Sequence, residues 1–448
     1  MGTLNTAIFT DPVNTTDTGT TTFEEAAFGN PLLAITMATG HAGGDADKAL
    51  INDATFTFGW AEGTGTGALD QTTIGCVMEH SPVNQDSGHA FSGQDCLALG
   101  ILASGRGVEG WSRATTFPDT NGYIGTTTNT LGDDFNAVTS LLSGSAISSR
   151  AAGVKQLTAS GTTTFNPGFQ ADVILFLGSN AKNMSAARAT STGCRFAVGV
   201  AVRDAGATTI QGQGSLSVSD NWNDAAGAPK ATVSNTQVQR PNNSSDTKAR
   251  WGLAVNSIAA GGDVTIEVFD SSDDAAQYSA TIGTSNHIAW YAFKLADGHT
   301  PLLINQESPT GDGVDTITTS GITPEWVLMI QTFLDTYDNN PDSAQAGAWS
   351  VSMMDASTQR CCSFQAENNA DPMNTSSTLA NQALYTPSDA GSVADSAHFA
   401  ATLDSFNSGN LKLDYTSELA DGRKQIFLVI GADVVASTTS TLGTLGVG

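Results

Sequence analysis

The stretch that decides the fold reads GTTTFNPGFQADVILFLGS and occupies residues 161–179. It consists of a Thr-rich lead, a turn with Pro or Gly, and a compact apolar run of strand length. The pattern occurs earlier as GTTTFEEAAFGNPLLAITMATG, residues 19–40, and later as TITTSGITPEWVLMIQTF, residues 316–333. A pattern that returns at roughly the spacing of one domain predicts an internal repeat of three units.

Four further blocks follow this stretch in the same order each time. They are an apolar strand from Phe56, Phe196 and Trp349, a strand entering a polar loop from Thr72, Thr208 and Ser357, a hairpin from Gly107, Ala249 and Ala397, and a closing strand from Phe135, His287 and Gln425. The hairpins show two alternating strands joined by a Gly or Asn turn. Agreement in order is harder to obtain by chance than any single match.

Short strands at regular spacing, with almost no helical period, predict an all-β chain. We expect three tandem antiparallel β-sandwich or jelly-roll domains related by internal repeat. Boundaries near Gly153 and Gly311 give a first and most divergent repeat at 1–153, a second at 154–310 and a third at 311–436. Residues 437–448 are expected to form a C-terminal tail or a docking strand.

The acidic charge balance of the chain limits the kinds of molecule that it can bind. The chain of 448 residues has 44 acidic and 18 basic side chains and a formal net charge of -26. Such a surface repels phosphates, so we expect no nucleic-acid binding by a basic patch. No apolar run reaches the length of a membrane span, and the first residues lack a secretion signal, so we expect a chain that does not enter a membrane.

Cysteine usage fits neither a disulfide framework nor a zinc site. The five cysteines are Cys76, Cys96, Cys194, Cys361 and Cys362, and no CxxC pair is present. We expect buried free thiols, while a disulfide between Cys76 and Cys96 stays open. Cys361 and Cys362 are adjacent on an expected strand and should point to opposite faces.

The common catalytic motifs are missing from the sequence, so we expect a protein that is not an enzyme and has no cofactor. The six histidines show no HxxxH or HExxH spacing, and no phosphate-binding loop or GxSxG elbow occurs. The acidic residues cluster in expected loops, whereas a glycosidase needs two carboxylates on rigid elements. Calcium remains open at Asp270, Asp273 and Asp274, although a solvated acidic turn is the simpler interpretation.

One tryptophan differs in context from the others. Trp222 lies in the polar sequence SDNWND, between Asp220 and Asp224. An aromatic ring in a polar loop can stack on a sugar or anchor a protein contact. We therefore name Trp222, Asp220 and Asp224 as candidate residues for binding a glycan or a protein.

Some of these motifs resemble those of tailed-bacteriophage virion proteins with concanavalin-like jelly-roll modules. The likeness rests on a GF-x-x-D-V turn at Gly168, Phe169, Asp172 and Val173, on an aromatic final strand at residues 289–294, and on Pro324, Glu325 and Val327 in the third copy. The first copy keeps the turn chemistry at residues 28–31 without the Asp. The resemblance implies a structural or adhesion role in a virion and carries over no catalytic residues.

Two functions follow as expectations. The first is a non-enzymatic virion component, either a capsid decoration or a tail protein, that contacts other virion structural proteins as a homo-oligomer or lattice subunit. Three similar domains in one chain can also imitate a trimer at a site of threefold symmetry. The alternative is a lectin-like adhesion module that binds a glycan of the host surface.

Overall fold

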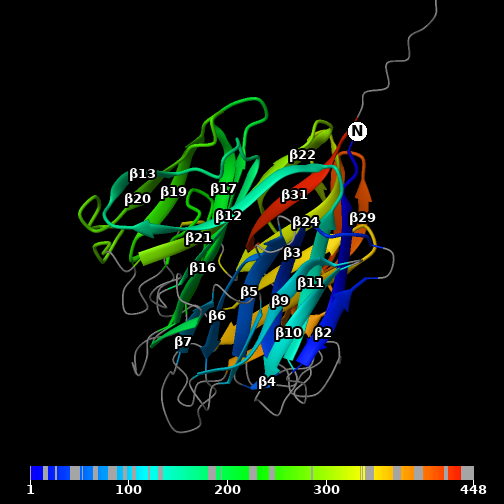
Figure 1. Ribbon diagram of the computed structural model, residues 1–448, viewed down its shortest axis with the longest axis horizontal. Helices are drawn as coiled ribbons and strands as arrows, with labels where there is room; N and C mark the ends of the chain where they lie inside the picture. The colour runs from blue at the N-terminus through cyan, green and yellow to red at the C-terminus, as the bar shows by residue number, and fades with distance from the viewer. Residues whose placement is uncertain are drawn as a thin grey trace, which may run out of the picture.

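The computed structural model in Figure 1 is an all-β molecule. It describes residues 2–13, 19–25, 28–40, 51–52, 54–63, 69–78, 88–93, 98–102, 107–119, 122–129, 135–179, 188–192, 194–220, 230–241, 248–283, 286–332, 334, 336–338, 348–366, 375–387, 397–417 and 422–434. The described residues form strands β1 to β31 and no helix, and every strand pairing among them is antiparallel. The prediction of an all-β chain built from antiparallel sheets is therefore confirmed.

Unit 1, residues 5–143, contains two sheets. The large sheet has the order β1 (Asn5–Val13), β11 (Phe135–Ser143), β3 (Leu33–Gly40), β5 (Ala54–Gly63), β6 (Leu69–Met78) and β7 (Gly88–Gly93). The small sheet has the order β2 (Gly19–Glu24), β10 (Gly122–Asn129), β9 (Gly107–Asp119) and β8 (Ala98–Leu102).

Unit 2, residues 147–295, has the same arrangement with a shorter small sheet. Its large sheet has the order β12 (Ile147–Leu157), β21 (Asn286–Leu295), β14 (Val173–Ser179), β16 (Cys194–Arg203), β17 (Ile210–Asp220) and β18 (Lys230–Ser234). Its small sheet has the order β13 (Gly161–Phe165), β20 (Val264–Phe269) and β19 (Gly252–Ile258).

Unit 3, residues 299–433, follows the same plan. Its large sheet has the order β22 (His299–Glu307), β31 (Lys424–Asp433), β24 (Ile322–Thr332), β25 (Trp349–Asp355), β26 (Gln359–Ala366) and β27 (Thr375–Ala380). Its small sheet has the order β23 (Gly313–Thr318), β30 (Asn410–Ser417), β29 (Ala397–Asn407) and β28 (Leu384–Pro387). Two more strands, β4 (Ile51–Asn52) and β15 (Arg188–Thr192), are added to a large sheet of another unit.

The strand order is the same in the three units, and each repeated sequence block lies at the same place in its unit. The junctions between units fall at residues 144–146 and 296–298, earlier than the expected boundaries. Gly153 lies inside β12, where a Cβ atom would approach Trp290 Cζ2 to 2.5 Å. Its glycine therefore serves packing and marks no linker. The first strand of each unit carries no repeated motif, so the sequence blocks could not place it.

The central strands of the large sheets are buried on both faces. In β14, Val173 and Leu175 pack into one hydrophobic core and Ile174 and Phe176 into another. A strand covered on both sides reads as a continuous apolar run, because neither face meets water. The run that decides the fold is therefore the middle layer between two cores.

One of these cores is shared by all three units. Each unit has its own apolar cluster between its large and small sheets, while the largest cluster contains side chains from the large sheets of units 1, 2 and 3 together. In Figure 1 the units can be followed by colour, from blue and cyan for unit 1 through green for unit 2 to yellow, orange and red for unit 3. The three units thus share one core in addition to the core that each unit has between its own two sheets.

A glutamine bridges the two sheets at the same place in each unit. The pairs are Gln71 with Ala114, Gln213 with Val255, and Gln359 with Leu403. The main-chain N–H donates to the side-chain oxygen at 2.9, 2.7 and 2.5 Å in turn. The small-sheet partner lies next to a β-bulge in every case. The glutamine satisfies backbone groups near an irregularity in the ladder.

Candidate functional site

Three aromatic side chains meet at the centre of the molecule. Phe56, Phe196 and Trp349 lie on the fourth strand of the three large sheets. Their ring centroids are 5.8 Å apart for Phe56 and Phe196, 4.4 Å for Phe56 and Trp349, and 5.5 Å for Phe196 and Trp349. All three side chains are buried to 1% exposure or less. One residue from each unit thus forms an aromatic triangle.

Polar contacts join each unit to the next one. Between units 2 and 3, Gln211 exchanges two hydrogen bonds with the main chain of Leu303. Between units 3 and 1, the indole N–H of Trp326 donates to Ser140 Oγ at 2.9 Å. Between units 1 and 2, Arg150 Nε lies 3.3 Å from Glu62 Oε2. These contacts close a ring. The first strands β12 and β22 meet the preceding unit through Arg150 and Leu303, and β1 meets unit 3 through Thr6 and Asp355.

Short segments also pass from unit to unit in a cycle. The segment β4 of unit 1 pairs with β27 of unit 3, and β15 of unit 2 pairs with β7 of unit 1. In unit 3, the N–H of Asp338 donates to the carbonyl of Val233 on β18 of unit 2, and Ser234 donates to the Asp338 carboxylate. Each of these three segments comes, in the chain, after the strand that is third in the large sheet of its own unit: β3, β14 or β24. Every unit therefore gives one segment and receives one.

The junction between units 1 and 2 contains a buried acid. Glu62 is 1% exposed, and neither of its carboxylate oxygens has a hydrogen bond of normal geometry to a described residue. Burial raises the pKa of Glu62 to about 7, although Arg150 acts in the opposite direction and Asp70 adds to the rise. This side chain therefore changes its charge near neutral pH.

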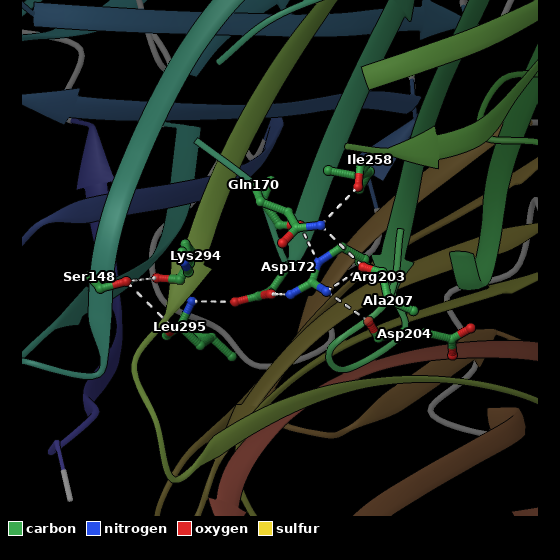
Figure 2. A network of polar contacts seen from close by, with 10 residues as sticks. Ser148, Gln170, Asp172, Arg203, Asp204, Ala207, Ile258, Lys294 and Leu295 are labelled. Carbon is green, nitrogen blue, oxygen red and sulfur yellow. Dashed lines mark hydrogen bonds and ion pairs between the residues drawn. The ribbon is translucent and has the colours of Figure 1, made fainter. Parts of the chain in front are cut away.

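The GF-x-x-D-V turn that carries the family resemblance forms the polar network in Figure 2. The Asp172 carboxylate pairs with Arg203 and accepts a hydrogen bond from the N–H of Leu295 at 2.8 Å. Arg203 and Gln170 both donate to the carbonyl of Ala207, at 2.7 and 3.1 Å. The network ties the turn before β14 to the end of β16 and to the end of β21. Its geometry explains the motif as an anchor of the fold.

In unit 3 a buried histidine meets a partly exposed glutamate. His299 Nε2 lies 3.1 Å from Glu325 Oε2, and the histidine side chain is 2% exposed. Burial raises the pKa of Glu325, although His299 beside it acts in the opposite direction. Glu325 belongs to the third-copy version of the motif and stands, like Asp172, just before the buried part of its strand. The pair holds the start of β22 to the start of β24.

The aspartates considered for calcium binding accept hydrogen bonds from main-chain N–H groups of local turns. The Asp270 carboxylate accepts hydrogen bonds from the N–H of Ser272 at 2.7 Å and of Ile282 at 3.0 Å. Burial alone would raise the pKa of Asp270, but the hydrogen bond from the Ser272 hydroxyl, together with those from the two N–H groups, lowers it. Asp273 accepts from the Asp270 N–H, and Asp274 from the N–H groups of residues 276 and 277. Among the described residues, no three His, Cys, Asp or Glu side chains are grouped to hold a metal ion.

Of the candidate residues for binding a glycan or a protein, the described part of the chain includes only Asp220. Asp220 ends β17, where it pairs with Cys194, while Trp222 and Asp224 lie outside the described residues. A polar hollow of about 420 Å³ is lined by Lys155, Gln156 and residues 158–163, and these lining residues include no aromatic ring. No helix long and apolar enough to cross a membrane occurs in the described part of the chain.

Three of the cysteines agree with the expectation of buried thiols. Cys76, Cys361 and Cys362 are free and buried, whereas Cys96 lies outside the described residues. Cys362 packs into the shared core and Cys361 into a cluster with Tyr385. The two neighbours therefore point to opposite faces, as predicted. Burial raises the pKa of the Cys361 thiol to about 12.

Two groups of residues escaped sequence reasoning. Arg150 and Glu62 carry no motif, and nothing in the sequence places β12 beside β5. Phe56, Phe196 and Trp349 stand at the start of corresponding sequence blocks. Their equivalent positions are the one sequence feature that could have predicted that the three side chains contact each other.

Comparison with known protein families, with curated proteins and with solved structures finds no match to this chain.

Proposed function

We propose that the protein is a non-enzymatic structural subunit of a tailed-bacteriophage virion, either decorating the capsid or forming part of the tail. The observation that carries the proposal is the closed ring of three units around the aromatic triangle of Phe56, Phe196 and Trp349. We also propose that the units are copies of one ancestral sandwich. One chain then has the shape of a trimer and suits a position of threefold or pseudo-threefold symmetry.

Several features of the described residues support this role. The polar groups in the interior hold units, turns and sheets together, as in the Asp172–Arg203 network and the glutamine bridges. The outer faces of three sandwiches offer area for several contacts, and a standard interface buries about 1,600 Å² in total. The resemblance of the turn at residues 168–173 to virion modules points to the same class.

The test is the protein composition of purified particles. Virions from a source that encodes this chain should contain it in a fixed ratio to the major capsid protein, measured by gel electrophoresis and quantitative mass spectrometry. The ratio should survive high-salt washing if the chain is a lattice or tail subunit. Absence from washed particles, with the chain recovered free in the lysate, would overturn the proposal.

A second experiment, on the purified protein, distinguishes the assembly role from the glycan-binding alternative. Purified protein on a glycan array should show no saturable binding if the role is assembly alone. Binding that is lost in Trp222→Ala, but kept in the core-conserving variant Trp349→Phe, would favour the adhesion function instead.

A further inference from the structure

The three junctions of the ring differ in chemistry at one corresponding position. A row of paired residues crosses each large sheet. The rows are Thr6, Leu142, Leu33 and Glu62 in unit 1, Arg150, Phe293, Val173 and Val202 in unit 2, and Pro301, Ile430, Trp326 and Asp355 in unit 3. Glu62, at the end of the row in unit 1, contacts Arg150 at the start of the row in unit 2, and Asp355, at the end of the row in unit 3, contacts Thr6 at the start of the row in unit 1.

Only one of these contacts between units is an ion pair. Glu62 faces Arg150 between units 1 and 2, and Asp355 accepts a hydrogen bond from Thr6 at 3.5 Å between units 3 and 1. Between units 2 and 3 the corresponding residues are Val202 and Pro301, which have no charge. The acid and base are therefore a special feature of one junction and not a requirement of the fold.

The surroundings of Glu62 disfavour its charged form. The groups that face it are Asp70 from β6, Arg150 and the main-chain N–H of Ala152 from β12, and the Tyr291 hydroxyl from β21. Asp70 lies opposite Glu62 in the β5–β6 pairing and repels a second negative charge. Arg150 divides its guanidinium between Glu62 and the carbonyl of Gly63. Burial keeps Tyr291 uncharged, because it raises the pKa of the phenol well above the usual value.

We propose that Glu62 and Arg150 form a pH-sensitive joint between units 1 and 2, which is closed while Glu62 holds a proton and loosens when Glu62 ionises. The ionised carboxylate is 1% exposed, and its contacts with Arg150, the Tyr291 hydroxyl and the Ala152 N–H do not offset its burial. It therefore regains hydration when β12 moves away from β5. This joint is independent of the virion role proposed above.

The direction and size of the effect follow from linkage. The pKa of Glu62 rises from 4.5 to about 7 in the closed joint. The stabilisation is fully present below pH 4.5 and is lost as the pH rises through about 7. A shift of this size weakens closing by up to about 300-fold between these limits, if the opened carboxyl titrates normally.

Hydrogen exchange of the full chain between pH 5.5 and 8.5 tests the joint. After correction for the intrinsic rate, exchange in β12 (Ile147–Leu157) should accelerate at least tenfold with a midpoint near pH 7. The corresponding first strands, β1 and β22, should show no such step. In Glu62→Gln the step in β12 should disappear, while Asp355→Asn, the matched variant at the junction of units 3 and 1, should keep it.

The proposal is overturned by a flat profile of β12 in the wild type, by equal steps in all three first strands, or by a step that persists in Glu62→Gln. If Glu62→Gln does not fold, Arg150→Met takes its place. Removing the guanidinium removes the influence that lowers the pKa of Glu62, so the midpoint must move to higher pH. An unchanged midpoint in Arg150→Met would count against the joint.

Discussion

The ring of Phe56 meets the indole of Trp349 edge to face, with the ring centroids 4.4 Å apart and the ring planes at 85°. Such a contact adds about 0.5–1.5 kcal/mol to the burial of the two rings. It joins the first unit of the chain to the last, and Phe196 of the second unit touches both rings. The stability of each unit should therefore depend on side chains of the other two.

Replacement of Trp349 by alanine should lower the free energy of unfolding by about 3–5 kcal/mol, because it empties the centre of the shared core. The loss should appear in all three units at once. Denaturant titration followed by hydrogen exchange of peptides from each unit measures both effects. Trp349→Phe is the control and should cost less. Loss of protection in unit 3 alone would show that the units fold independently.

Removal of a bridging glutamine should cost about 1–3 kcal/mol, because it leaves main-chain groups without their partner. Gln71→Ala, Gln213→Ala and Gln359→Ala change the same bridge in three units and should give similar losses in chemical denaturation. The exposed Thr164→Ala provides a baseline, expected to stay within about 0.5 kcal/mol. Three unrelated values would argue against a common structural role.

Proline in β15 should disturb the sheet of another unit. Ala189→Pro and Thr190→Pro fall on the two alternating sets of backbone groups, so one of them removes an N–H that pairs with β7. Hydrogen exchange of β7 in unit 1 should then accelerate in that variant. Acceleration confined to the neighbourhood of residue 190, with β7 unchanged in both variants, would contradict the exchange of segments.

Neutralising Asp172 should destabilise the chain by about 3–5 kcal/mol, because Arg203 would remain as a buried charge without its partner. Asp172→Asn keeps the shape of the side chain. Thermal unfolding of this variant can be compared with Glu307→Gln, which breaks the pair with Lys424 at a residue that is 53% exposed. The exposed pair should contribute about 1 kcal/mol or less. Equal effects would mean that burial of the Asp172 network adds nothing.

Cys361 should resist alkylation in the native protein at pH 8, since burial holds its pKa near 12 and keeps it a thiol. Peptide mass spectrometry after iodoacetamide treatment should find Cys361 and Cys362 unmodified in folded chain and modified in urea. Rapid native labelling of both would show that β26 opens easily.

The sequence carried enough to predict the architecture within a unit. Repeated blocks marked the equivalent strands, and the alternation in residues 397–417 indicated the hairpin of β29 and β30. The apolar run of β14 also indicates burial on both faces. Val173 to Leu177 include no polar residue, which is typical of a strand with a hydrophobic core on each side. The first strand of each unit escaped, because its half-exposed residues repeat no motif.

The junction chemistry was beyond sequence reasoning. Glu62 and Arg150 are far apart in the chain, so no local pattern pairs them. The sequence also does not distinguish a buried ion pair from an exposed one. The aspartates of residues 270–274 illustrate the converse. Their clustering left calcium open beside the simpler interpretation of a solvated acidic turn. Their oxygens accept hydrogen bonds from local N–H groups, an arrangement set by turn geometry that the letters alone do not give.

The cyclic exchange of segments has a consequence for how this protein can evolve. A linear solenoid gains or loses repeats at its ends with little penalty, since each repeat meets only its neighbours. Here deletion of any one unit would leave an orphan donor and a bare sheet edge elsewhere. We therefore expect loss of a whole unit to be tolerated far less than substitutions or loop insertions within a unit.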